Sequence, residues 1–361
     1  MVGVLGWVAF TQRFDQSGHV EQTITLTNGQ GFEIMRILVT GGAGYVGSHC
    51  VRELTKAGHD VWVYDNLSRG HFQAAPKGRL IVGDLTDQAR LTAALRERQI
   101  EAVMHFAAFA LVGESVSQPH LYYGNNVVGS FHLLEAMRAA GVGRIVFSST
   151  TATYGTPEKM PIAETTPQQP INPYGFSKLV VEHMLDDYAH AYGLAFAALR
   201  YFNAAGAAPE GDLGEDHDPE SHLIPIVLQV ALGQRDKIMI FGDDYPTPDG
   251  TCIRDYVHIL DLASAHLAAL ERLQPGKGIK CNLGTGRGYS VKEVIDTCRK
   301  ITGHPIPAAI APRRPGDPPE LVADSRLARQ TLNWTPKFAT IESIVETAWR
   351  WHKAHPRGFT S

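Results

Sequence analysis

Apolar runs and amphipathic segments alternate along the chain from Met35 to about residue 150. The runs RILVT, DVWVYD, RLIVGD, AVMHFAA and RIVFSST are almost continuously apolar and have the length of strands. Between them, YVGSHCVRELTKAG, QARLTAALRER and NVVGSFHLLEAMRAAG repeat apolar residues at helical spacing. Strands that alternate with helices predict an α/β fold with a doubly wound parallel sheet, and such apolar strands are typical of a sheet buried on both faces.

A glycine-rich turn follows the first of these strands. Gly41, Gly44 and Gly47 form the pattern G-x-x-G-x-x-G at the start of a helix. There the first glycine permits a tight turn, the second lets the backbone approach a pyrophosphate, and the third lets the helix pack on the strand. Asp65 ends the second strand, where a carboxylate binds the adenosine ribose and repels a 2′-phosphate. The pattern predicts a Rossmann domain that binds NAD rather than NADP, with a purely structural turn as the alternative.

Three regions of the chain are predicted. Residues 1–34 form an N-terminal extension that is expected to be disordered, since a short apolar opening is followed by a polar stretch without a secretory signal pattern. Residues 35–200 form most of the NAD-binding domain. Residues 201–361 form mainly a smaller C-terminal α/β substrate domain, from which later segments return to the first domain.

A second candidate site lies in the stretch PINPYGFSKLVVEHML. Tyr174 and Lys178 are four residues apart on a helix that is predicted to begin near Pro173, so they share a face. An ammonium near a phenol favours the phenolate and lowers the pKa of the phenol from about 10. Thr150 follows the fifth strand and is placed to bring a hydroxyl to Tyr174. The pattern predicts a general base, and a surface pair on a helix is the alternative.

Composition and charge limit the classes of binding partner that the chain is expected to have. The net charge of −4 gives no basic field for nucleic acid or an acidic membrane. The four cysteines are scattered without a C-x-x-C pair, so we expect reduced thiols in a cytoplasmic protein, and neither a zinc site nor disulfides. The histidines show no H-x-x-x-H spacing, and no metal is expected. No apolar run reaches the roughly 18 residues of a membrane span.

The chain resembles the extended short-chain dehydrogenase/reductase family, and within it the branch of the UDP-galactose 4-epimerases. The resemblance runs from about Met35 to Phe359 and is carried by separated motifs. These are VTGGAGYVGSH, YDNLSRG, GDLTD, HFAAFALVGES, YYGNNVVGS, FSSTTATYG, NPYGFSK, LRYFNAAGA, HLIP, FGDDYPTPDGTCIRDYVHILDLA, NLGTGRGYSV and APRRPGD. The stretch from Phe241 to Ala263 is typical of that branch.

The resemblance implies a set of residues for each ligand. The NAD contacts would come from Gly41, Gly44, Tyr45, Val46, Gly47, Asp65, Asn66, Asp84, Leu85, Phe106, Ala107, Asn125, Lys178 and Tyr201. The UDP-sugar contacts would come from Thr150, Tyr174, Asn203, His222, Leu223, Phe241, Arg254, Arg314, Asp317 and Leu321. Among these, Phe241 would lie beside the uracil, Asp317 would bind the uridine ribose, and Arg254 and Arg314 would bind the diphosphate, which suits the guanidinium fork.

The implied reaction interconverts UDP-galactose and UDP-glucose. Tyr174 would take the proton of the 4-hydroxyl, and NAD would take the hydride of carbon 4. The keto sugar would then turn over, and the hydride and the proton would return to it. Lys178 and Thr150 would lie beside the base. Three positions depart from the common pattern: Ala110 replaces a lysine, Thr150 replaces a serine, and Leu321 stands where a residue limits the sugar pocket. The stretch from Phe202 to His222 would be a long loop near the nucleotide sugar.

Three alternatives remain. The first is 4-epimerisation of another UDP-sugar, such as an N-acetylhexosamine, a glucuronate or a pentose. The second is a nucleotide-sugar 4,6-dehydratase, which Thr151 and Ala152 disfavour because that branch has Asp-Glu there. The third is a non-catalytic NAD-sensing module, which would be expected to lose Tyr174 or Lys178. The resemblance also implies a homodimer, formed through the helices near Asn125 and Tyr174.

Overall fold

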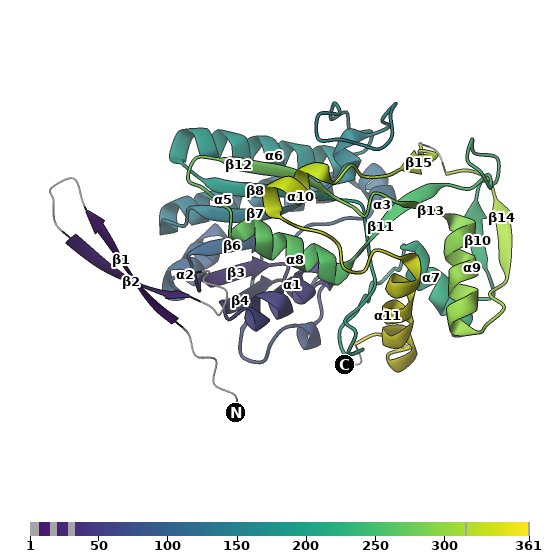
Figure 1. Ribbon diagram of the computed structural model, residues 1–361, viewed down its shortest axis with the longest axis horizontal. Helices are drawn as coiled ribbons and strands as arrows, with labels where there is room; N and C mark the ends of the chain where they lie inside the picture. The colour runs from purple at the N-terminus through teal and green to yellow at the C-terminus, as the bar shows by residue number, and fades with distance from the viewer. Residues whose placement is uncertain (1–6, 15–19, 28–32, 315, 360–361) are drawn as a thin grey trace.

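A seven-stranded parallel sheet forms the centre of the computed structural model, which describes residues 7–14, 20–27, 33–314 and 316–359. The strand order is β12-β8-β7-β6-β3-β4-β5 (Figure 1). The bounds are β3 Arg36–Thr40, β4 Asp60–Asp65, β5 Leu80–Val82, β6 Ala102–His105, β7 Arg144–Thr150, β8 Ala195–Tyr201 and β12 Gly278–Leu283. The predicted doubly wound α/β fold is confirmed.

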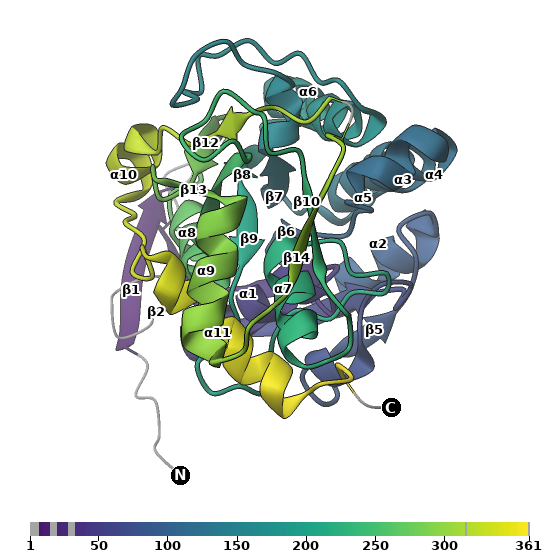
Figure 2. The same ribbon diagram turned by 90° about the vertical axis from the view of Figure 1, so that its right-hand side faces the viewer.

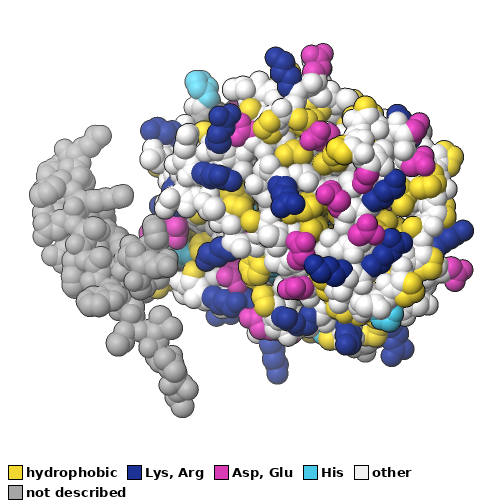
Figure 3. Space-filling view, turned by 45° about the vertical axis from the view of Figure 1, so that its right-hand side comes forward, with side chains coloured by type: hydrophobic (Ala, Val, Ile, Leu, Met, Phe, Trp, Pro, Cys, Tyr) yellow, Lys and Arg dark blue, Asp and Glu magenta, His cyan; other side chains and the backbone are white. Residues whose placement is uncertain are grey.

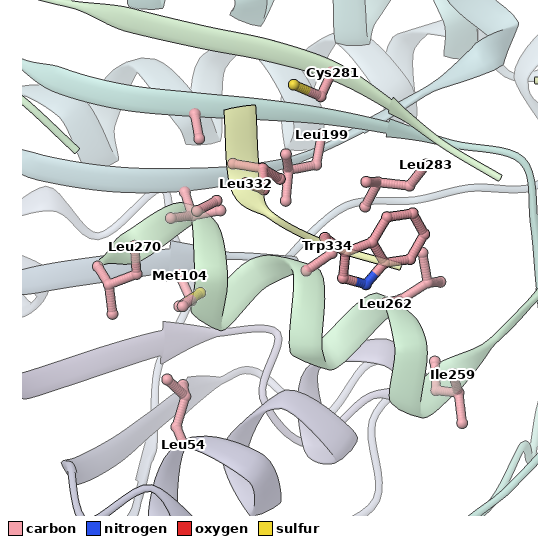
Figure 4. Close-up of a cluster of buried hydrophobic side chains, with 14 of the residues drawn as sticks. Leu54, Met104, Leu199, Ile259, Leu262, Leu270, Cys281, Leu283, Leu332 and Trp334 are labelled. Carbon is pink, nitrogen blue, oxygen red and sulfur yellow. The ribbon is translucent and has the colours of Figure 1, made fainter. Parts of the chain in front are cut away.

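Both faces of the sheet are buried, as the apolar strands predicted. Alternate residues of β3 enter different clusters, with Ile37 and Val39 on one face and Leu38 on the other. Helices α1 and α8 cover the first face, where the core also includes Trp334 (Figure 4). Helices α2, α5 and α6 cover the second face. Their bounds are α1 Tyr45–Lys56, α2 Gln88–Glu97, α5 Gly129–Ala140, α6 Pro173–Tyr192 and α8 Ile259–Leu270.

The helix ends follow local sequence signals. Asn172 caps α6 by accepting a hydrogen bond from the backbone N–H of Gly175, and Pro173 occupies the first helical position. The predicted helix over NVVGSFHLLEAMRAAG begins with the π-helical turn η2 (Tyr123–Val128) and continues as α5. Shorter pieces lie between the main elements: η1 Phe72–Ala74, α3 Val112–Ser117, α4 Pro119–Tyr122 and η3 Thr151–Tyr154.

The C-terminal part of the chain builds a smaller α/β region in front of the sheet (Figure 2). Strand β11 pairs with β9, β13 and β15, while β10 and β14 pair as a separate parallel ribbon. Residues of β9, β10, β11 and β13 share an apolar cluster with residues of three helices, α7, α9 and α11. The bounds are β9 Asn203–Ala205, α7 Leu223–Ala231, β10 Ile238–Phe241, β11 Ile253–His258, β13 Gly288–Ser290, α9 Val291–Thr302, β14 Ala308–Ala311, β15 Glu320–Leu321, α10 Arg326–Leu332 and α11 Ile341–Ala354. Strand β12 and helix α8 lie on the large sheet, and the domain boundary near residue 200 stays a prediction.

The N-terminal extension contains two strands. β1 (Trp7–Phe14) pairs antiparallel with β2 (Val20–Thr27), in a register that places Trp7 opposite Thr27. This pairing differs from the disorder expected for residues 1–34. The sequence VEQTITLT offers a reason, because its β-branched residues favour extended backbone. Residues 1–6, 15–19 and 28–32 lie outside the described residues.

Charge of both signs is spread over one face of the molecule (Figure 3). On the face shown in Figure 3, Lys and Arg side chains alternate with Asp and Glu side chains, so no field of one sign covers it. Within the described ranges, no helix has the length and apolar character that a membrane span requires.

Candidate functional site

The predicted site residues gather at the carboxyl ends of the parallel strands. Asp65 ends β4, Thr150 ends β7 and Tyr201 ends β8. Thr150 and Tyr201 are partners in the parallel register of β7 and β8, so these two side chains start from neighbouring points. In open α/β sheets, ligands bind in the crevice beyond these strand ends.

The glycine-rich turn has the geometry of a phosphate cradle. Gly41 has a φ of +70°, and a Cβ there would lie 2.5 Å from the backbone nitrogen of Ala107. A Cβ on Gly47 would lie 2.2 Å from the carbonyl oxygen of Gly41, so this glycine is needed for helix α1 to approach the turn. A Cβ on Gly44 would meet its nearest neighbour at 3.4 Å, which leaves the helix start open to a ligand. Tyr45 and Val46 begin α1, and their amides belong to the first turn that accepts anions.

The two glycines should respond differently to alanine. We expect Gly47→Ala to destabilise the protein by about 1–3 kcal/mol, because its Cβ overlaps the Gly41 carbonyl. Gly44→Ala should cost less than about 1 kcal/mol, since its backbone conformation suits alanine, but it should lower the NAD content by obstructing the pyrophosphate. Denaturant unfolding and NAD released on denaturation measure the two effects. Equal stability of both variants, with NAD unchanged, would refute this division of roles.

Asp65 is buried and braces the turn. Its Oδ2 accepts a hydrogen bond from the backbone N–H of Ala43 at 3.0 Å, and its Oδ1 accepts one from Leu67 at 2.8 Å. Burial raises the pKa of Asp65, and the two amide hydrogen bonds act in the opposite direction. Each carboxylate oxygen retains a second lone pair, so binding of ribose hydroxyls is compatible with this geometry. Asn66 donates a hydrogen bond to Asp84 Oδ2 at 2.7 Å, which brings these two predicted residues together.

Apolar and aromatic residues line the neighbouring strand ends. Leu85 is buried, and its side chain lies 3.1 Å from where a Cβ on Gly129 would be. The ring of Phe106 packs against His266, with ring centroids 4.8 Å apart. The backbone N–H of Ala107 donates a hydrogen bond to the Thr40 carbonyl at 3.1 Å, which fixes the start of the loop after β6.

Tyr174 and Thr150 lie together as predicted. Tyr174 stands in the first turn of α6, and its ring is 6.4 Å from that of Tyr122 in an edge-on contact. Burial raises the pKa of Tyr174, and a hydrogen bond with Thr150 acts in the opposite direction. Thr150 is itself buried, and its Oγ1 also accepts a hydrogen bond from the backbone N–H of Ala152. The pair can bind a hydroxyl group presented to it.

Lys178 lies deeper than the sequence suggested. Its ammonium donates a hydrogen bond to the carbonyl of Ser148 at 2.8 Å and lies over the ring of Phe147. Burial lowers the pKa of Lys178 to about 7, while Glu182 acts to raise it. The four-residue spacing of Tyr174 and Lys178 predicts that Lys178 lowers the pKa of Tyr174. Burial of the phenol instead gives a raised pKa, since desolvation penalises the phenolate.

Asn126 is not among the predicted site residues, although its neighbour Asn125 is. Its side chain is buried, accepts a hydrogen bond from the Phe109 backbone N–H at 2.8 Å and donates to the Phe109 carbonyl at 3.0 Å. It also donates to Ser177 Oγ, one residue before Lys178. Asn125 is half-buried and donates to Asn126 Oδ1. Asn126 thus ties the loop after β6 to α6.

The predicted substrate residues lie mainly on the small sheet. Asn203 in β9 donates a hydrogen bond to the Asp255 carbonyl at 3.1 Å, and Arg254 in β11 is the register partner of Leu321 in β15. Arg254 forms an ion pair with Asp317, so two residues assigned to different parts of the ligand contact each other directly. This contact is not visible in the sequence, because the two are far apart along the chain.

The remaining substrate residues lie around β10 and the start of α7. The guanidinium of Arg314 is 4.1 Å from the ring centroid of Phe241, a cation–π arrangement that gathers a flat apolar surface and a positive charge. His222 is the N-terminal cap residue of α7, which Leu223 begins. The His222 imidazole contacts the carboxylate of Glu215, a residue that the sequence analysis did not select.

Comparisons with known proteins identify the family of the chain. A profile of the NAD dependent epimerase/dehydratase family matches residues 37–284. The UDP-glucose 4-epimerase of Halalkalibacterium halodurans is 56% identical over 328 residues, which cover 91% of this chain and 98% of that protein. The UDP-glucose 4-epimerase from Brucella ovis, solved in complex with NAD, is 49% identical with a TM-score of 0.84, covering 87% of this chain and 97% of that one. The Bifidobacterium longum enzyme, in complex with NAD+ and UDP, is 40% identical with a TM-score of 0.86, covering 90% of this chain and all of that one. With a profile match over more than half of its length and relatives that align nearly end to end, this chain belongs to the NAD dependent epimerase/dehydratase family.

Proposed function

We propose that this chain interconverts UDP-galactose and UDP-glucose by transient oxidation at carbon 4 of the sugar, with a tightly bound NAD. The observation that carries the proposal is the placement of the Tyr174–Thr150 pair at the carboxyl end of the sheet that also carries the glycine-rich turn. Relatives named UDP-glucose 4-epimerase share about half of their residues with the chain over nearly their whole length.

NAD supplies the hydride acceptor when it is bound in the cradle of Gly41, Gly44 and Gly47. Tyr174 takes the proton of the sugar 4-hydroxyl and later gives it back. Thr150 donates or accepts a hydrogen bond at the same oxygen and so orients the hydroxyl toward the phenol. Lys178 contributes positive charge close to the base from its position on the Ser148 carbonyl.

The UDP portion is the anchor in this proposal, and the sugar is the part that moves. Phe241 and Arg314 would hold the uracil and a phosphate, and Arg254 would exchange its ion pair with Asp317 for the diphosphate. A grip confined to the nucleotide leaves the keto sugar free to turn and to present its other face. Hydride would then return to the opposite face of carbon 4 and the proton to the oxygen on that carbon, so that no net oxidation occurs.

The direct test is turnover without added nucleotide. We expect the purified protein to convert UDP-galactose to UDP-glucose, and to release about one NAD per chain on denaturation, because the cofactor is regenerated in each cycle. Parallel assays with UDP-N-acetylglucosamine, a UDP-glucuronate and a UDP-pentose would identify another preferred sugar. Consumption of added NAD in step with turnover would instead identify a dehydrogenase.

Leu321 is proposed to limit the size of the sugar. It is half-buried beside Arg254 and packs against the main core. Leucine leaves part of the space that a tyrosine would fill, so we expect slower but measurable turnover of UDP-N-acetylglucosamine. Leu321→Tyr should suppress that activity and largely spare UDP-galactose, since a steric clash acts on the larger substrate alone. An unchanged ratio of kcat/KM for the two substrates would remove Leu321 from the pocket wall.

We also propose a homodimer in the cytoplasm. Four apolar side chains on η2, α5 and α6 are 39–47% exposed: Tyr123, Val128, Phe131 and Phe176. We propose that these four side chains form the contact between two copies, because exposed apolar patches mark sites of interaction between proteins. Sedimentation tests this arrangement: we expect wild type to be a dimer and Phe131→Lys to be a monomer. Cell fractionation tests the location.

A further inference from the structure

Four side chains with metal-ligand chemistry converge in the loop between β9 and α7. They are Glu215, His217, Glu220 and His222, in the sequence pattern E-x-H-x-x-E-x-H. One oxygen or nitrogen atom from each lies within 4.8 Å of the others. The glycine-rich turn and the Tyr174 centre do not use this group, and His222 is its only member that is also a predicted substrate contact.

The spacing of these atoms suits one shared ion. His217 Nδ1 is 3.2 Å from Glu215 Oε1 and 3.8 Å from Glu220 Oε2, and His222 Nδ1 contacts the same Glu215 oxygen. Ligand atoms at about 2.0–2.2 Å from a tetrahedral Zn²⁺ are about 3.3–3.6 Å from one another. Small shifts of the side chains would therefore place all four atoms around a single centre.

Burial makes compensating positive charge necessary at this point. The side chains of Glu215 and Glu220 are only 4% and 3% exposed. In the described part of the chain, their ion-pair partners are imidazoles, with no lysine or arginine within ion-pair distance. Two buried carboxylates need compensating positive charge. A divalent ion held by two carboxylates and two neutral imidazoles gives a neutral centre.

Backbone N–H groups orient the Glu220 carboxylate, and a side chain of α11 holds the backbone of Glu215. Glu220 Oε1 accepts hydrogen bonds from the backbone N–H groups of Ser221 and His222, at 2.7 and 2.8 Å, which leaves Oε2 facing the cluster. The carbonyl of Glu215 accepts a hydrogen bond from the Trp351 indole at 2.9 Å. Metal ligands are typically fixed in this way by neighbouring groups.

We propose that Glu215, His217, Glu220 and His222 bind one divalent transition-metal ion, with Zn²⁺ the best match. Imidazole with carboxylate is a zinc-type ligand set, whereas Ca²⁺ and Mg²⁺ prefer oxygen alone. The ion has a structural role. The ring of His217 lies 6.0 Å from that of Tyr45 at the start of α1, and His222 directly precedes the first residue of α7. The ion thus joins the long loop to both the nucleotide-binding turn and the first helix of the substrate region.

The alternative is an ion-free cluster in which protonated histidines compensate the charge of the two glutamates. Although burial lowers it, the hydrogen bonds of Glu215 and Glu220 raise the pKa of His217 to about 10 in the ion-free protein. Imidazolium groups would then supply the positive charge. The two arrangements differ in metal content, which can be measured without any assay of activity.

Metal analysis of the full-length protein, purified without chelator or metal-affinity resin, should find about one equivalent of zinc. His217→Ala should weaken binding of added Zn²⁺ at least about tenfold in competition with a chromophoric chelator. The matched control is His190→Ala, because His190 is exposed in the last turn of α6 and should leave binding unchanged. Chelation should lower the Tm of wild type, and Zn²⁺ should restore it, with no such response in His217→Ala.

Co²⁺ added to the chelated wild type provides a readout that needs no variant to fold. An intense visible spectrum typical of four-coordinate Co²⁺ is expected, and Zn²⁺ should abolish it. Failure of wild type to bind Zn²⁺ or Co²⁺, or equal binding by wild type and His217→Ala, would overturn the proposal and leave the protonated cluster. Zinc-loaded protein without epimerase activity would count against the proposed function alone.

Discussion

Tyr174→Phe is expected to lower kcat for UDP-galactose about 10²–10⁴-fold, the usual contribution of general acid–base catalysis. The substitution keeps the ring, with its edge-on contact to Tyr122, and removes the oxygen that would take the 4-hydroxyl proton. NAD content and unfolding temperature should stay close to those of wild type. Steady-state kinetics of the purified variant measure the effect, and near wild-type turnover would reject Tyr174 as the base.

Tyr122→Phe is the matched control for this prediction. Tyr122 lies beside Tyr174, but its hydroxyl donates hydrogen bonds to the Leu111 carbonyl and the Glu114 carboxylate. Its loss should reduce stability by about 1–3 kcal/mol and leave turnover within about tenfold of wild type. A loss of rate equal to that of Tyr174→Phe would show that general disturbance of this region, rather than the missing base, explains both results.

Arg200→Met is expected to destabilise the protein by about 3–5 kcal/mol, since it leaves a buried carboxylate without its charge partner. The side chains of Arg200 and Glu182 are 3% and 1% exposed. Arg200 Nε donates to both Glu182 oxygens, at 2.9 and 3.2 Å, and a second nitrogen donates at 2.5 Å. Denaturant midpoints of wild type and variant, each with its NAD, measure the change. A loss below about 1 kcal/mol would contradict the importance of this ion pair.

The double variant Arg200→Met with Glu182→Leu separates charge from packing. Removing both partners also removes the uncompensated charge, so most of the lost stability should return. The double variant should still differ from wild type near the active site, because Glu182 acts to raise the pKa of Lys178. Equal destabilisation of the single and double variants would assign the loss to packing instead.

The sequence predicted the large sheet and its cofactor turn because both are local patterns. Each apolar run of the first half became a strand of the sheet, and Gly41, Gly44 and Gly47 occupy the turn that their spacing indicated. Pro173 likewise predicted the start of α6, which begins at that residue. Such signals depend on residues within one or two turns of each other.

Contacts between distant segments could not be predicted in this way. The Arg254–Asp317 ion pair joins residues 63 positions apart, and Asn126 bonds to Ser177 from another helix. Glu215, His217, Glu220 and His222 are close in sequence, but two of the four are glutamates. The spacing of the histidines alone therefore does not indicate the cluster. The four-residue spacing predicted that Lys178 shares a face of α6 with Tyr174. Its burial depends on the strands packed against that face, which the spacing does not indicate.

In the proposed reaction, hydrogen leaves carbon 4 as hydride and returns to the same carbon within one active site. UDP-galactose that carries deuterium at carbon 4 tests it most directly, with product analysed by NMR and mass spectrometry. The proposed reaction predicts UDP-glucose with the deuterium retained at carbon 4 and no hydrogen taken up from water at any carbon. Loss of the label to solvent, or solvent hydrogen at carbon 4 or carbon 5 of the product, would contradict it.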